Sequence, residues 1–146
     1  MGAGTLENLP DWGLELLSSA RVGHLGLLDS AGRPRVMPIT YGLFGDSFWS
    51  AVDDKPKRVR GDELARVRWL RESPSAALTV DRYDDDWSRL AWVQVLGTVA
   101  VAERPPKAVI GALAARYPPY RERAPRGPWL ELSPERVLWW RAADTR

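Results

Sequence analysis

Four cations follow one short apolar segment of this 146-residue chain. The segment Phe48–Val52 has the composition of a buried strand, and two aspartates and a Lys-Pro-Lys-Arg run come directly after it. Loops at strand ends commonly carry binding residues, and lysine is a good ligand for phosphate. The run therefore indicates either an anion-binding site or a solvated charged loop. Its four cations are Lys55, Lys57, Arg58 and Arg60.

A helix is expected directly behind these cations. Asp62 is a suitable N-cap, and Leu64, Val67 and Leu70 give the segment one narrow apolar face. Backbone N–H groups at the start of a helix add partial positive charge. With aromatic Trp49 on the preceding strand, the segment would suit a ligand with a flat ring at one end and a phosphate at the other. A flavin or a deazaflavin has this form.

Other chemistries have little support in the sequence. The chain has no Cys and a single His, His24, so neither a thiol nucleophile nor a metal site is expected. No glycine-rich phosphate loop has the required spacing, and the acidic run 84–86 lacks the ligand spacing of a calcium loop. A bound cofactor would therefore carry any redox chemistry. Tyr41 and Tyr83 are candidate proton donors, and no residue is assigned as catalytic.

The composition fits one domain with a single core. Apolar residues make up 45% of the chain, and 21 cations against 19 anions leave a net charge of only +2. No apolar run approaches the roughly 18 residues of a membrane helix, and no secretory signal is recognisable, so a cytoplasmic protein is expected. Eight Trp residues favour a planar ligand or a partner chain, whereas neither a membrane nor a nucleic acid is expected as a partner.

Hydrophobic periodicity and the Gly and Pro positions predict a mainly β (α+β) barrel of about six antiparallel strands with two to three short helices. One predicted strand, Pro34–Leu43, contains Pro38, which indicates an edge position or a bulge. The Arg-rich loop 121–126 is expected to be a mobile connection or a lid. Residues 1–146 are predicted to form one domain, with an N-terminal helix in 1–19, the barrel core in 20–104, and a helix, a loop and a closing strand in 105–146. The predicted strands are 21–29, 34–43, 48–52, 75–83, 89–103 and 135–142, and the predicted helices are 11–20, 63–73 and 105–117.

Several stretches are typical of one known family. They are ARVGHLGLLDSAGRPRVMPITYGL (20–43), FWSAVDDKPKR (48–58), SPSAALTVDRYDDDWSRLAWVQVLGTVAVAE (73–103) and the closing ERVLWWRA (135–142). In these stretches the chain resembles the pyridoxamine-5′-phosphate-oxidase-like split β-barrel superfamily, and more narrowly its coenzyme F420-dependent branch. The pairing of AVDDKPKR with DRYDDDWSRLAWV is the most specific part of the resemblance.

The resemblance implies an FMN-binding-like split β-barrel that forms a homodimer with two cofactor sites between its protomers. The implied cofactor is coenzyme F420, with FMN as the alternative, and the implied reaction is hydride transfer from the reduced deazaflavin to a conjugated small-molecule acceptor. Lys55 and Lys57 would hold the phosphate, with Arg58 or Arg60 close by. The ring would lie along 38–40 and 49–51, and Trp92 would approach it from the fifth predicted strand. The implied cofactor-binding residues are Pro38, Ile39, Thr40, Trp49, Ser50, Ala51, Lys55, Lys57, Arg58, Arg60 and Trp92.

Two alternatives to an F420-dependent enzyme remain open at this point. One is an FMN-binding oxidase or flavin reductase of the same fold, and the other is a non-catalytic carrier or sensor of a flavin or tetrapyrrole. The chain departs from the family's pattern at Arg35, where a His is common, and at Trp69, where an Asn is common. It also has no recognisable Arg and His substrate clamp near its C-terminus, so pyridoxamine-phosphate oxidation itself is not expected.

Overall fold

The computed structural model describes residues 1–52 and 60–144, with the side chains of 60–64 outside the description. Strands and helices alternate along the chain, and three single 3-10 turns cover Leu6–Asn8, Trp87–Arg89 and Ala142–Asp144. The strands are β1 (Gly2–Gly4), β2 (Gly23–Leu28), β3 (Pro34–Ile39), β4 (Gly42–Phe44), β5 (Ser47–Ala51), β6 (Ser75–Arg82), β7 (Ala91–Ala102) and β8 (Trp129–Arg141). The helices are α1 (Asp11–Ser19), α2 (Arg60–Glu72), α3 (Lys107–Arg116) and α4 (Pro119–Glu122).

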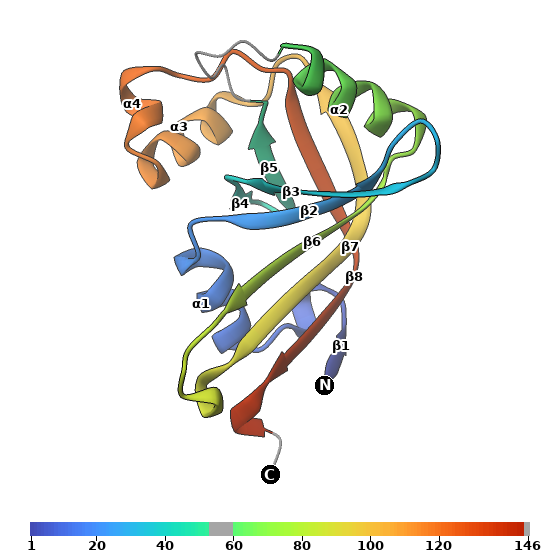
Figure 1. Cartoon of the computed structure of the whole chain (residues 1–146). Coiled ribbons are helices and arrows are strands. Elements are labelled where there is room, and N and C mark those ends of the chain that lie inside the picture. Colours follow the sequence, from blue (N-terminus) through green and yellow to red (C-terminus); the bar gives the residue numbers. More distant parts are fainter. Residues whose placement is uncertain (53–59, 145–146) are drawn as a thin grey trace.

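All eight strands of the described residues join one antiparallel sheet. Its order is β3-β2-β6-β7-β8-β5-β4, and β1 pairs with the far end of β8. The long strands β7 and β8 pair from Ala91 opposite Arg141 to Ala102 opposite Trp129. Because β8 also pairs with β5, it bends the sheet so that two halves face each other (Figure 1).

The hydrophobic core packs against the inner face of this bent sheet. Along β7, Val93, Val95 and Val99 are buried, whereas the alternate residues Trp92 and Gln94 are only half-buried. This period of two is expected when one face of a sheet is packed and the other is not. We call the face that carries Trp92 and Gln94 the outer face. Helix α1 packs against β6 and β7, and α2 packs against β2 and β7.

A second, smaller core lies between β5 and α3. Trp49 and Ala51 on β5 pack with Leu113 and Val109 of α3 and with Trp129 of β8. Phe48 and Val52 face the main core instead, so β5 is buried on both of its faces. Figure 1 shows α3 and α4 together on this side of the sheet, beside β4 and β5.

The predicted mainly β antiparallel class is confirmed, with eight strands in place of about six. One added strand is β1, which precedes α1 within the segment 1–19 that was expected to be only a helix. The other arises because the predicted strand Pro34–Leu43 breaks at Thr40–Tyr41 into β3 and β4. Pro38 does lie on an edge strand, as its missing N–H predicts.

The predicted starts of one helix and one strand were wrong, and one predicted loop contains a helix. Helix α2 begins at Arg60, so Asp62 lies inside it and is not its N-cap. Strand β8 begins at Trp129 because a bulge at Glu135, which is unpaired between the pairs Leu96–Arg136 and Gly97–Pro134, lets the strand continue past Pro134. The predicted loop after α3 contains the short helix α4, because Pro119 occupies a first-turn position where a missing N–H costs nothing.

Candidate functional site

The break between β3 and β4 brings two of the predicted site residues together. The Ser50 hydroxyl donates a hydrogen bond of 2.6 Å to the backbone carbonyl of Thr40. Among the described residues, Ser50 is the one buried polar residue, and this bond satisfies its hydroxyl group. We call Thr40 and Tyr41, the two residues that join β3 to β4, the corner.

Two tyrosines from the α3–α4 region hold the corner from the other side. The Tyr117 hydroxyl accepts the Tyr41 N–H at 3.1 Å and lies 3.0 Å from the Tyr41 carbonyl and 2.9 Å from the Arg21 carbonyl. The Tyr120 hydroxyl is 2.7 Å from Thr40 Oγ1, and either atom can donate. Sequence reasoning assigned no role to these tyrosines, although the repeated Tyr and Pro of YPPY, 117–120, was a visible signal.

Tyr41 is buried and takes no part in proton transfer to a ligand. Its hydroxyl donates 2.6 Å to the Leu17 carbonyl, and Arg116 lies over its ring at 4.9 Å. Burial raises the Tyr41 pKa to about 12, although the Arg116 charge opposes that shift. The other candidate donor, Tyr83, is 69% exposed on the turn after β6.

Arg116 ties the corner to the end of α1. Its guanidinium donates to the Leu17 carbonyl at 3.3 Å and also contacts the carbonyls of Ser18 and Ala20. These carbonyls end a helix, where a cation is favourable. The corner is thus supported by polar contacts on β5, α1, α3 and α4.

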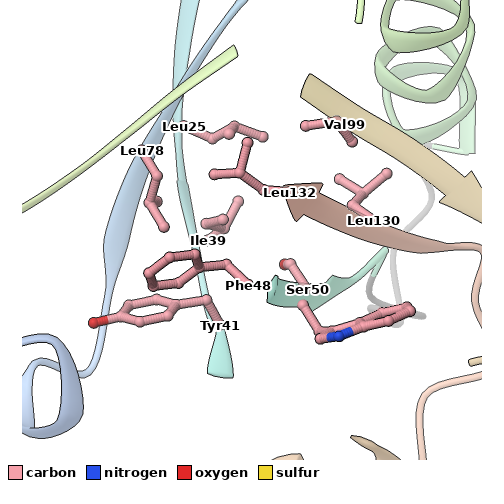
Figure 2. Close-up of a pocket in the computed structure, with 10 residues that line it drawn as sticks. Leu25, Ile39, Tyr41, Phe48, Ser50, Leu78, Val99, Leu130 and Leu132 are labelled. Atoms are coloured by element: carbon pink, nitrogen blue, oxygen red, sulfur yellow. The ribbon is translucent and has the colours of Figure 1, made fainter. Parts of the chain in front are cut away.

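Among the described residues, the space beside Ile39 and Ser50 is too small to hold a flat cofactor. A cavity of about 10 Å³ lies between the two halves of the sheet, and a site of that size holds about one water. Figure 2 shows Ile39 of β3, Phe48 and Ser50 of β5 and Leu132 of β8 around this cavity. The side chains of Ile39 and Ser50 therefore point into the core, and any ring must lie elsewhere.

Trp49 and Ala51 are occupied by the second core. Their exposed fractions are 7% and 5%, because α3 covers this face of β5. Trp49, which was predicted from the sequence to lie beside the ring, is therefore a core-packing residue in the single chain.

Pro38 and Trp92 both point to the outer face but lie apart. Pro38 is opposite His24 on β2, and the same row continues through Thr79 to Gln94 on β7. Trp92 is two residues farther along β7, opposite Trp140. Three strand spacings separate β3 from β7, roughly 14 Å. One protomer alone does not bring Pro38 and Trp92 to one point.

Part of the outer face is apolar and open in the single chain. Val36 is 71% exposed, Val22 44% and Leu28 37%, whereas such residues are usually covered. Small residues on β2, β6 and β7 leave a groove of about 490 Å³ across this face. Arg35 and Glu135 are its charged residues.

Two residues that differ from the pattern of the resembled family, Arg35 and Trp69, contact each other. The Arg35 guanidinium lies over the Trp69 ring at 4.7 Å, and one of its nitrogens is 3.6 Å from an Asp29 carboxylate oxygen. Arg35 is on β3 and Trp69 on α2, so the pair joins the edge strand to the helix that follows the cationic segment. Backbone N–H groups of Arg33 and Ala31 bond Asp29, and the first of these is the main reason its pKa is lowered.

The predicted phosphate ligands are only partly within the described chain. Lys55, Lys57 and Arg58 lie outside the described residues, and Arg60 is the first residue of α2.

Arg121, in the loop expected to be mobile or a lid, donates to the Ala114 and Ala115 carbonyls at 2.9 and 2.8 Å.

In the part of the chain that the structure describes, no helix has both the length and the hydropathy to cross a membrane.

No protein-family model and no curated protein matches the chain. Solved structures do match in fold. An FAD-binding protein from Mesorhizobium loti superposes with a TM-score of 0.65 at 18% identity, over 95% of this chain and 97% of that one. The heme storage protein HutZ from Vibrio cholerae gives 0.67 at 14% identity, over 88% and 90%. A Clostridium acetobutylicum protein related to general stress protein 26, of the pyridoxinephosphate oxidase family, gives 0.59 at 18% identity, over 88% and 84%.

The chain has the split β-barrel fold. At these identities the likeness establishes the arrangement of the strands and nothing about ligands. It agrees with the antiparallel sheet in which β8 joins both halves.

Proposed function

We propose that this protein is a redox enzyme that binds a flavin-type cofactor beside the corner. The observation that supports the proposal best is the fixed Thr40, whose carbonyl is held by Ser50 and whose hydroxyl lies beside Tyr120. The corner adjoins β5, and the cationic segment follows β5 directly in the sequence. A ring beside the corner and a phosphate on that segment would match the two ends of a flavin.

The proposed cofactor is coenzyme F420, and FMN is the alternative. Either group, when bound, supplies hydride chemistry toward a conjugated small molecule. The Thr40 hydroxyl can hydrogen-bond a ring carbonyl, and the exposed Pro38 offers a flat apolar surface without a donor. The residues of the chain thus bind and orient the ring, and the apolar outer face excludes water from it. Among the neighbours, an FAD-binding protein and a member of an oxidase family support a flavin-type ligand.

Cofactor choice is tested by titrating the purified protein with coenzyme F420 and, separately, with FMN. Eight Trp residues make intrinsic fluorescence a suitable signal. Saturable quenching by coenzyme F420 with weaker quenching by FMN is the expected result. A yellow protein with a flavin spectrum on purification would favour FMN, and quenching by neither would end the proposal.

Lys57→Ala tests the phosphate end of the site. Loss of a charge-assisted contact should weaken cofactor binding by about 1.5–3 kcal/mol. Arg68→Ala is the matched control, because Arg68 is an exposed cation of α2 outside the predicted phosphate-binding residues. Equal effects of both substitutions would point to general charge loss and would place the phosphate elsewhere.

We also propose that two copies of the chain associate through the outer face. The exposed Val36, Val22 and Leu28 would be covered in this way, and Pro38 of one copy would approach the outer-face residues of the other. Pro38 and Trp92 lie apart within one chain, but in a dimer Pro38 of one copy would lie near Trp92 of the other. The cofactor would then lie between the protomers.

A second candidate function, tetrapyrrole binding without turnover, is favoured by His24. The only imidazole of the chain is exposed on the apolar outer face, where it could ligate a heme iron. One structural neighbour is named a heme storage protein. Hemin should then give a Soret band that shifts in His24→Ala. An unshifted band would remove the reason for this alternative.

A further inference from the structure

The hydroxyl pair of Thr40 and Tyr120 does more than close the corner. Tyr120 is on α4 and Thr40 follows β3, and their oxygens lie 2.7 Å apart across 80 positions of sequence. Both residues are half-buried. A hydrogen bond of this length between side chains so distant in sequence fixes one element against the other.

The backbone of the corner is already held without Tyr120. Ser50 binds the Thr40 carbonyl, and Tyr117 binds the N–H of Tyr41 and lies beside its carbonyl. What remains free at Thr40 is the rotation of its own side chain, which has few allowed rotamers. The Tyr120 hydroxyl acts on that rotation, so its contribution is to the direction of one hydroxyl and much less to the fold.

Tyr120 itself is held firmly. Its ring meets the Tyr117 ring edge-on at 5.7 Å and 66°, and its N–H donates to the Tyr117 carbonyl at 2.9 Å. The neighbouring Arg121 anchors α4 to the last carbonyls of α3. A phenol on such a support keeps its partner in one orientation.

Either hydroxyl of the pair can donate the hydrogen bond between them. Each hydroxyl has one donor and two acceptor positions. If Tyr120 donates to Thr40 Oγ1, the Thr40 proton is directed to a third group. A ring carbonyl oxygen, which both an isoalloxazine and a deazaflavin carry, is an acceptor for it.

We propose that Tyr120 is a positioning residue that orients the Thr40 hydroxyl as a hydrogen-bond donor to a carbonyl of the bound cofactor ring. This inference rests on the proposed function, because it needs a ring beside the corner. It adds a residue, and a role for α4, that the sequence did not indicate.

The test compares Tyr120→Phe with the wild type and with Ser18→Ala. Affinity for FMN and for coenzyme F420, the absorption spectrum of the bound ring and the melting temperature are measured for each protein. Tyr120→Phe should bind about three- to tenfold more weakly and shift the ring spectrum, while the melting temperature stays close to that of the wild type. Ser18→Ala, which removes an exposed hydroxyl that bonds only within α1, should behave as wild type in all three.

Coupling provides the second readout. Adding Tyr120→Phe to Thr40→Val should cost no further affinity, because the oriented group is already gone, whereas Thr40→Ser should retain wild-type affinity. Should Tyr120→Phe fail to fold, Thr40→Val still tests the oriented hydroxyl, and wild-type affinity and spectrum in that variant would overturn the inference. Additive losses, or an unchanged spectrum in Tyr120→Phe, would overturn the inference. Wild-type protein that binds neither cofactor would instead overturn the proposed function.

Discussion

Tyrosine hydroxyls carry much of the polar structure around the candidate site. The Tyr41 hydroxyl bonds a carbonyl of α1, whereas the Tyr117 and Tyr120 hydroxyls bond the corner. Tyr41 is fully enclosed and ties β4 to α1, whereas Tyr120 is half-buried at the corner where a ligand is proposed. A hydroxyl at the surface of a site can orient a ligand, and one in the core can only stabilise the fold.

Tyr41→Phe should therefore destabilise the protein without a direct effect on binding. Loss of the buried bond to Leu17 should lower the free energy of unfolding by about 1 kcal/mol at pH 8. The raised pKa adds a pH dependence. Between the unfolded pKa near 10 and the folded pKa of about 12, the unfolded wild-type chain loses the Tyr41 proton first, so wild-type stability falls as the pH rises.

Urea unfolding at pH 8 and at steps from pH 10 to 12 would show this effect. The wild-type advantage over Tyr41→Phe should disappear across that range, because the variant has no proton to lose at this position. Tyr83→Phe serves as the control for an exposed tyrosine. A constant difference between wild type and Tyr41→Phe at all pH values would mean that Tyr41 titrates normally.

At the scale of elements, the register of β7 and β8 depends on close backbone contact at the bulge. A Cβ added at Gly97 would lie 2.0 Å from the Ser133 carbonyl oxygen, which belongs to the backbone and cannot turn aside. At Gly26, on the outer face of β2, the nearest atom to such a Cβ would be 3.7 Å away. One glycine is thus needed for strand pairing, while the other only helps to shape the groove.

Gly97→Ala should cost about 2–3 kcal/mol of unfolding free energy, because β7 and β8 must separate locally. Gly26→Ala is the matched substitution and should be neutral or slightly stabilising, since alanine has less backbone freedom to lose in a strand. Chemical denaturation of both variants measures the difference. Equal stabilities would show that the bulge can shift to accept a methyl group.

At the scale of the whole molecule, the inner face of the sheet is packed, whereas the outer face is covered by α3 at β5 and is open over β2 and β3. Helices α1 and α2 contact the sheet, yet the outer face keeps Val36 and Val22 exposed beside a groove. An exposed apolar face of this kind marks an interaction surface. The proposed dimer would cover it and place the cofactor where two chains meet.

Val36→Asp should weaken that dimer by at least about tenfold, because it would bury a charge at the interface. Sedimentation velocity across a range of protein concentrations would measure the dissociation constant. Phe44→Asp alters a similarly exposed apolar residue on β4, at the opposite end of the sheet, and should leave the dimer intact. Wild-type protein that stays monomeric at every concentration would contradict the proposal.

The sequence alone determined the class of fold and the edge position of Pro38. Alternating apolar residues in 89–103 and the Pro and Gly punctuation depend on local backbone chemistry, which one chain segment carries by itself. The tertiary structure decided which site residues are covered and which are partners, because both depend on which segments of the chain meet. Tryptophan is a residue type that favours flat ligands, but α3 covers Trp49 in this fold. Thr40 gained Tyr120 as a partner only because α4 folds back over the corner, and no local pattern records a contact between residues 80 positions apart.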